Sequence, residues 1–237
     1  MLLWLPPIVF IAALGALAWR VAGWRVGVFA MAAFTLIGMV GLWRLTMITL
    51  SMVAASVLVC LIIGLPLGIL AARSDRFQRG LRPVLDVMQT TPAFVYLVPV
   101  VMLFSIGTVA GVIATIIFAL PPLIRLTDLG IRQVPEDVIE AAEAFGSSER
   151  EILVKVRFPL ALPTIMAGIN QTIMLALSMV VIAALIGASG LGLPVVEGLN
   201  ALRIGTAGIG GLAIVLLAIV LDRLTQAFGA GGRARRG

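Results

Sequence analysis

Several residue types that carry chemistry in soluble enzymes are rare or missing in this sequence of 237 residues. It contains no histidine, so we expect neither a metal centre nor a histidine proton relay. Its single cysteine, Cys60, excludes a disulfide within the chain, and its place in an apolar run is typical of a small core residue. Its single lysine, Lys155, lies between Val154 and Val156. No G-x-x-x-x-G-K-[ST] phosphate loop therefore exists, and the chain is not itself a P-loop ATPase.

Charged residues are also scarce. They make up 12% of the sequence, whereas soluble domains carry about 25%. Hydrophobic residues make up 61%, and the mean hydropathy is +1.17. These values predict an all-α polytopic membrane protein. The net charge of +6 is then a signal of membrane topology, and we expect no nucleic-acid partner.

Apolar runs long enough to cross a bilayer recur along the chain, since a span needs about 20 apolar residues. The sequence predicts seven spans, at residues 2–19, 26–43, 46–72, 88–105, 109–124, 162–187 and 206–228. The first run lacks a basic segment before it, which predicts a retained span and not a cleaved signal peptide. The charged residues 73–86 predict a loop at the membrane surface, and the glycine-rich residues 188–205 predict a short re-entrant or surface segment.

The basic residues are distributed very unevenly over the two sides of these spans. Of the 17 lysines and arginines, only Arg44 and Arg203 fall on one side. Positive residues accumulate on the cytoplasmic side, so the sequence predicts an outside N-terminus and a cytoplasmic C-terminus. Residues 229–237, with Arg233, Arg235 and Arg236, are expected to form a basic cytoplasmic tail near anionic lipid.

Residues 135–159, here called the polar hairpin, are the longest polar stretch and hold six of the eleven acids. Such side chains are costly in lipid, so the stretch should lie outside the bilayer, between two spans. Its apolar residues recur at helical spacing and make a narrow stripe of Val138, Ala141, Ala142 and Phe145. The simplest alternative is an ordinary cytoplasmic loop that happens to be helical.

The order of residues in the polar hairpin predicts helix, turn, helix. Pro135 suits a first helical position, and Gly146 suits the residue just after a helix end. Ser148 and Glu151 have the spacing of a capping box that opens a second helix. Pro159 is expected to end that helix.

The same stretch resembles the EAA signature of ABC importer permeases, which reads E-A-A, three residues, G, nine residues, I-x-L-P. The matching residues are Glu140, Ala141, Ala142, Gly146, Val156, Phe158 and Pro159. Val156 stands for isoleucine and Phe158 for leucine, both apolar exchanges. The resemblance implies that these residues form the coupling helices, which sit in a groove of a separate ATP-hydrolysing subunit.

Further runs look like the glycine betaine/proline betaine permease subfamily. They are residues 89–99, 118–127, 163–172 and 177–183. The resemblance covers roughly residues 45–228, and residues 1–44 are interpreted as two added transmembrane helices. It implies the type I ABC importer permease fold, with five core helices and these two N-terminal ones.

The resemblance also implies partners and a location. It implies a permease homodimer in the bacterial inner membrane, an ABC ATPase subunit and an extracytoplasmic substrate-binding protein. The chain would be a non-catalytic subunit without a cofactor or metal of its own, because ATP and Mg²⁺ would bind to the ATPase.

Candidate residues for the solute path were chosen by chemistry. Betaines are zwitterions without net charge, so dipoles and aromatic faces suffice to bind them. The candidates are Gln89, Thr91, Tyr96, Asn170, Gln171 and Ser178. For each, ordinary hydrogen bonding between helices is the alternative. Asp128 and Asp222 lie near span ends, where snorkelling or local pairing explains them.

Other functions stay open at this stage. The same architecture serves importers of choline, carnitine or another small solute. A carrier or channel without an ATPase would move solute alone, and a membrane scaffold would bind a soluble enzyme without solute flux.

Overall fold

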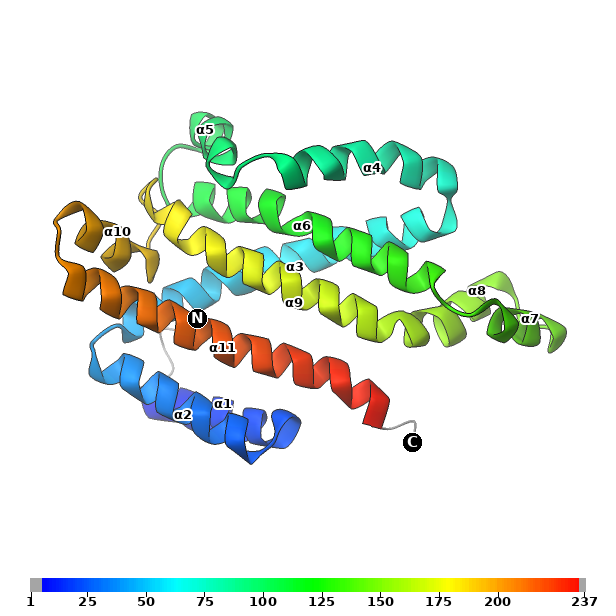
Figure 1. Ribbon diagram of the computed structural model, residues 1–237, viewed down its shortest axis with the longest axis horizontal. Helices are drawn as coiled ribbons and strands as arrows, with labels where there is room; N and C mark the ends of the chain where they lie inside the picture. Colours follow the sequence, from blue (N-terminus) through cyan, green and yellow to red (C-terminus); the bar gives the residue numbers. More distant parts are fainter. Residues whose placement is uncertain (1–5, 235–237) are drawn as a thin grey trace.

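The computed structural model describes residues 6–234, with side chains described to residue 229, and this part of the chain contains helices and no β-strand (Figure 1). The helices are α1 (Pro7–Ala22), α2 (Trp24–Met39), α3 (Trp43–Arg73), α4 (Asp75–Thr90), α5 (Ala93–Phe104), α6 (Thr108–Arg132), α7 (Glu136–Ala144), α8 (Glu149–Glu151), a π-helix (Ile152–Arg157), α9 (Phe158–Ala184), α10 (Gly192–Asn200) and α11 (Ile204–Ala234).

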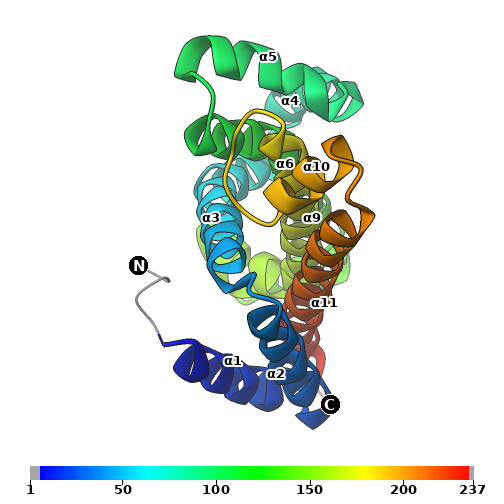
Figure 2. The same cartoon turned by 90° about the vertical axis from the view of Figure 1, so that its left-hand side faces the viewer.

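Four long helices, α3, α6, α9 and α11, run side by side along the molecule and form its centre (Figures 1 and 2). Each is long and apolar enough to cross a membrane. The largest shared interfaces are those of α6 with α9 and of α3 with α6. The all-helical permease fold expected from the sequence is therefore confirmed.

Small residues allow α3 and α6 to approach closely. A Cβ atom at Gly68 would lie 2.5 Å from Cβ of Thr127, and one at Gly64 would lie 2.9 Å from Cδ2 of Leu123. Neither distance is possible for a real side chain. The G-x-x-x-G spacing of these two glycines is therefore a packing device between two membrane helices.

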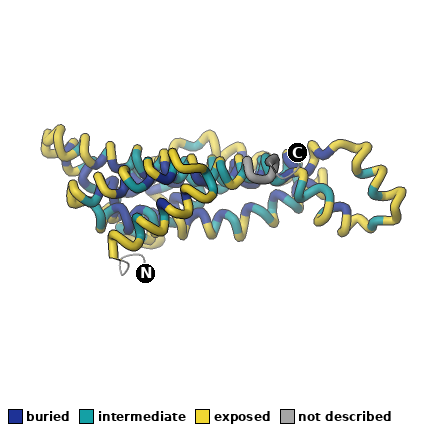
Figure 3. The backbone as a smooth tube through the Cα atoms, turned by 90° about the horizontal axis from the view of Figure 1, so that it is seen from below, coloured by how far each residue is buried: buried dark blue, intermediate teal, exposed yellow. Residues whose placement is uncertain are grey.

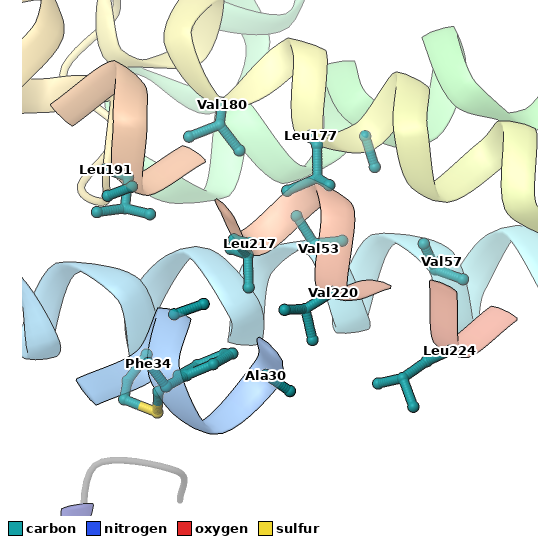
Figure 4. Close-up of a cluster of buried hydrophobic side chains, with 14 of the residues drawn as sticks. Ala30, Phe34, Val53, Val57, Leu177, Val180, Leu191, Leu217, Val220 and Leu224 are labelled. Atoms are coloured by element: carbon teal, nitrogen blue, oxygen red, sulfur yellow. The ribbon is translucent and has the colours of Figure 1, made fainter. Parts of the chain in front are cut away.

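An apolar core joins the long helices to the first two. Phe34 of α2 and Leu217 and Val220 of α11 are almost fully buried in one cluster with residues of α3 and α9 (Figure 4). Helices α1 and α2 form a hairpin, here called the N-terminal hairpin, that packs on α11 (Figure 2). Each has 16 residues. At 1.5 Å per residue each is about 24 Å long, shorter than the hydrocarbon layer of about 30 Å.

The prediction of a surface loop at residues 73–86 is wrong, because this stretch is most of helix α4. Ser74 caps the helix, and its Oγ accepts a hydrogen bond from the Phe77 amide at 3.3 Å. The predicted span at 88–105 is divided between the end of α4 and all of α5. The chain bends by 99° between α4 and α5, at Thr91 and Pro92. A proline fixes its own φ and disfavours helix at the residue before it, which explains the break.

The number of spans depends on this bent pair. Four helices pass the length and hydropathy criteria, and the bent pair makes a fifth if it is one span. The two shorter helices of the N-terminal hairpin bring the total to the seven expected. Residues 188–205, for which the sequence predicts a short re-entrant or surface segment, contain the short helix α10. Residues 2–5 of the first predicted span, and Arg235 and Arg236 of the predicted tail, lie outside the described residues.

Candidate functional site

The first half of the polar hairpin is α7, which protrudes beyond the ends of α6 and α9 (Figure 1). Pro135 is its N-cap and not its first helical residue, a shift of one position. Gly146 follows the helix with φ of +78°, a conformation in which an L side chain is strained. The Gly146 amide donates to Glu143 O at 2.8 Å, and the Ser147 amide donates to Ala142 O at 3.1 Å. These two bonds form a Schellman motif, so the predicted stop at Gly146 is confirmed.

The second half opens with the capping box that the spacing predicted. The Glu151 amide donates to Ser148 Oγ at 3.4 Å, and the Ser148 amide donates to Glu151 Oε2 at 3.1 Å. Lys155 Nζ donates to Glu151 Oε1 at 2.9 Å. The hydrogen bond from Lys155, followed by those from Ser148, lowers the pKa of the exposed Glu151 carboxyl from 4.5 to about 2. Local bonds therefore hold the turn in one shape.

The apolar stripe of α7 is not buried by the described part of the chain. None of the nine residues of α7 is buried. Phe145 is 91% exposed and Val138 is 37% exposed. Figure 3 shows that this end of the molecule is coloured mostly as exposed. This leaves an exposed helix with an uncovered phenyl ring at one end of the molecule.

Pro159 does not end the second helix, contrary to the prediction. Residues 149–184 form one continuous helix of 36 residues, in which α8 leads through the π-helix at 152–157 into α9. A proline inside an α-helix lacks an amide donor and its ring clashes with a carbonyl one turn earlier. The wider π turn just before Pro159 changes this hydrogen-bond register, and π-bulges of this kind recur at functional sites.

The second half of the polar hairpin, which includes Phe158 of the EAA match, packs on the bundle. Ile152 is buried, and Leu153 and Phe158 pack in a cluster with Ala72 of α3 and Ile131 of α6. The two halves of the polar hairpin thus differ. The first is exposed, and the second packs on α3 and α6 and continues into α9.

Three of the six candidate path residues lie around the bend between α4 and α5. Gln89 is exposed near the end of α4. Thr91 Oγ1 donates to Val87 O at 2.7 Å, and Tyr96 Oη donates to Met88 O at 2.7 Å. The Tyr96 ring also lies beside Phe118, with ring centroids 6.4 Å apart. Two of these polar groups therefore stabilise the bend itself.

Asn170 and Gln171 lie elsewhere, in a groove of about 430 Å³ between α9 and α11. Asn170 Nδ2 donates to Asp222 Oδ1 at 2.9 Å, and Thr225 Oγ1 donates to Asn170 Oδ1 at 2.6 Å. Gln226 Nε2 also donates to both oxygens of Asp222 at 2.8 Å. The bonds of Asn170 join α9 to α11.

Ser178 is apart from both groups. It is exposed, and its Oγ donates to Met174 O of the same helix at 3.0 Å. The structure therefore brings the six candidates into two groups and one isolated residue, and their part in a solute path stays a prediction.

A row of polar side-chain pairs joins α4 to α6, and the sequence did not predict it. Arg132 Nη1 donates to Asp75 Oδ1 at 2.6 Å, and Gln78 Nε2 donates to Asp128 Oδ2 at 2.6 Å. Arg125 pairs with Asp86. The sequence predicts local pairing of Asp128, but not its partner on α4, because it predicts a loop at residues 73–86. The signal was available, since charged residues recur on one face of each helix.

The bundle and the exposed polar hairpin define a multi-pass helical membrane protein of the importer-permease class. Residues 64–231 match the model of a family described as the binding-protein-dependent transport system inner membrane component. This chain belongs to that family.

Named relatives sharpen the comparison. The chain is 57% identical over 235 residues to the glycine betaine/proline betaine transport system permease protein ProW of Escherichia coli K12, covering 99% of this chain and 66% of that protein. It is 55% identical over 186 residues to the glycine betaine/carnitine transport permease protein GbuB of Listeria monocytogenes, covering 78% of this chain and 66% of that one. The chain thus spans slightly less than two thirds of the length of these relatives.

A solved structure agrees with the fold. A chain of the MetNI methionine ABC transporter, in an inward-facing conformation, matches with a TM-score of 0.65 and 26% identity, over 79% of this chain and 92% of that chain. The predicted resemblance to glycine betaine permeases is confirmed. It extends further than expected, because the alignment with ProW includes the N-terminal hairpin that had been left outside it.

Proposed function

We propose that this chain is the permease subunit of an ATP-driven importer of glycine betaine-type osmoprotectants. The observation that carries the proposal is the polar hairpin, a rigid helix pair outside the membrane bundle whose first helix has no buried residue. Its EAA match assigns it to contact with an ATPase. The hydrolysis of ATP, and the binding of ATP with Mg²⁺, belong to that separate subunit.

The geometry supports a route by which the polar hairpin moves the bundle. The hairpin continues without a break into α9. Helix α9 in turn holds α11 through Asn170, which bonds both Asp222 and Thr225. A displacement of the hairpin by the ATPase would therefore shift α9 and α11 together. Coupled motion of these two helices is what opens and closes the solute path in this proposal.

The remaining partners follow from the family. A second copy of the chain would complete the path, and an extracytoplasmic binding protein would deliver the solute. The polar hairpin and the end of α11 lie toward the same end of the molecule (Figure 1). This arrangement supports a cytoplasmic C-terminus and an outside N-terminus in the bacterial inner membrane, as the charge distribution predicted.

Glycine betaine is the solute that the two relatives share in their names, at 57% and 55% identity. They differ in the second solute, proline betaine or carnitine, so carnitine is the alternative to test. All of these solutes carry a quaternary ammonium, which aromatic faces bind. Tyr96 and Phe118 supply such a pair near the α4–α5 bend.

Reconstitution tests the proposal. The chain, an ATPase subunit and a betaine-binding protein from the same source would be purified together in mild detergent and placed in liposomes. We expect the ATPase to copurify, and its hydrolysis of ATP to rise with betaine-loaded binding protein. The chain without ATPase should show no betaine flux. Flux through the chain alone would indicate a carrier or channel, and ATPase binding without any flux would indicate a scaffold.

A further inference from the structure

The tip of the N-terminal hairpin combines two exposed tryptophans with two exposed arginines. Trp19 and Trp24 are each 59% exposed, on either side of the turn at Gly23. Arg20 and Arg25 are also exposed, and the guanidinium of Arg25 lies 5.7 Å from the Trp24 ring centroid. Tryptophan and arginine are the residues that settle at the boundary between lipid tails and headgroups.

Close packing fixes the shape of this tip. A Cβ atom at Gly27 would lie 2.9 Å from Cβ of Trp19 and 3.0 Å from the carbonyl oxygen of Gly15. The two helices are therefore in backbone contact just below the turn. Trp19 is held at one edge of this contact, so its indole is presented and not free to fold away.

The charges of Arg20 and Arg25 have no counterpart in the described part of the protein. Residues 1–74 contain no aspartate or glutamate. Neither Arg20 nor Arg25 forms an ion pair among the described residues.

The short length of the hairpin draws the tip to the headgroups. Each helix is about 24 Å long, against a hydrocarbon layer of about 30 Å. A short span is accommodated by flanking residues that reach for the interface and by local thinning of the bilayer. The arginines at the tip are such flanking residues, and they would reach the headgroup layer.

We propose that the tip of the N-terminal hairpin, formed by Trp19, Arg20, Trp24 and Arg25, binds the headgroups of anionic phospholipids. The partner is a lipid surface rich in phosphatidylglycerol, chosen by charge: two exposed arginines without an ion pair among the described residues, no acid in the first 74 residues, and two exposed indole rings beside them. Each arginine near such a surface contributes a preference of about fivefold for anionic over zwitterionic lipid.

Tryptophan quenching tests this in the full chain. Trp4 and Trp43 would be changed to phenylalanine, so that only the two tip indoles report. The protein would be placed in nanodiscs that contain either brominated phosphatidylglycerol or brominated phosphatidylcholine as the minor lipid. We expect quenching at several-fold lower mole fraction with the phosphatidylglycerol.

Matched variants identify the cause. Arg20→Gln with Arg25→Gln should remove the preference, and Arg20→Lys with Arg25→Lys should retain it, since both keep positive charge. Arg44→Gln, in the first turn of α3 and beyond the end of α2 that is remote from the tip, should leave it unchanged. Size-exclusion and helical circular dichroism check folding, and rising salt should weaken the preference of the lysine variant and the parent alike. Equal quenching by both lipids in the parent, a preference that survives in the glutamine variant, or no quenching by either lipid would each overturn the proposal.

Discussion

Replacing Gly146 with alanine separates the shape of the polar hairpin from its contacts. The added Cβ would meet no atom within 4 Å, so the effect is confined to the backbone. At φ of +78° an L-residue costs about 1–2 kcal/mol more than glycine. If the ATPase recognises only the closed turn, the competent population falls by at most about 5- to 30-fold, and the apparent Kd rises by the same factor.

The assay is titration of the ATPase onto the permease in nanodiscs, read as Kd and as betaine-stimulated ATP hydrolysis. Gly80→Ala is the matched control, because Gly80 lies inside α4, also has no atom near a built Cβ, and has an ordinary helical conformation. It should leave the Kd unchanged. Gly146→Asn should recover most of the affinity, because asparagine tolerates a left-handed conformation. If Gly146→Ala binds like Gly80→Ala, or if Gly146→Asn binds no better than Gly146→Ala, the turn is not what the ATPase recognises.

Three further outcomes are expected. Phe145→Ala should change the free energy of unfolding by no more than about 0.5 kcal/mol, because the ring is 91% exposed. It should weaken ATPase binding by about tenfold or more if the ring anchors the interface, and an unchanged Kd in the same titration would remove Phe145 from the contact. The pKa of Glu151 is about 2 in the fold against an ordinary 4.5, so its ionised form stabilises the fold above pH 4.5 and this contribution is lost as the pH falls toward 2. Glu151→Gln should therefore flatten the pH dependence of the unfolding midpoint between pH 4.5 and 2, and an identical pH profile would contradict the ion pair with Lys155. Asn170→Leu leaves the carboxylate of Asp222 with Gln226 alone and should destabilise by about 1–3 kcal/mol in a thermal unfolding assay, whereas equal stability would show that the bond between α9 and α11 contributes nothing.

Local rules predicted the polar hairpin well. The capping box at Ser148 and the stop at Gly146 depend on neighbours three to five residues away, so sequence spacing alone specifies them. The prediction that the helix ends at Pro159 is wrong for a different reason. The π turn ahead of it is stabilised by the packing of Leu153 and Phe158 on α3 and α6, and no spacing in the sequence shows that packing.

Helix α4 shows that a cluster of charged residues in a sequence does not by itself predict an exposed loop. Six charged residues within residues 73–86 looked like a surface loop. Two of them, Asp86 and Asp75, pair with Arg125 and Arg132 of α6, which lie 39 and 57 residues further along the chain. Only the folded arrangement reveals which charges are paired. The path candidates share this limit, because a hydrogen-bonding residue looks the same in the sequence whether it stabilises a bend or lines a route.

The uninterrupted helix from residue 149 to residue 184 has a mechanical consequence. With 36 residues it is about 54 Å long at 1.5 Å per residue, longer than the bilayer is thick. A rod of this length that pivots near its middle converts a tilt of about 5° into a movement of about 2 Å at each end, in opposite directions. If the proposed ATPase pushes on the polar hairpin, the far end of α9 would move without any change in the internal hydrogen bonds of the helix. The backbone of one helix would then carry the displacement from one side of the membrane to the other, and the side chain of Asn170 would be needed only to pass it on to α11.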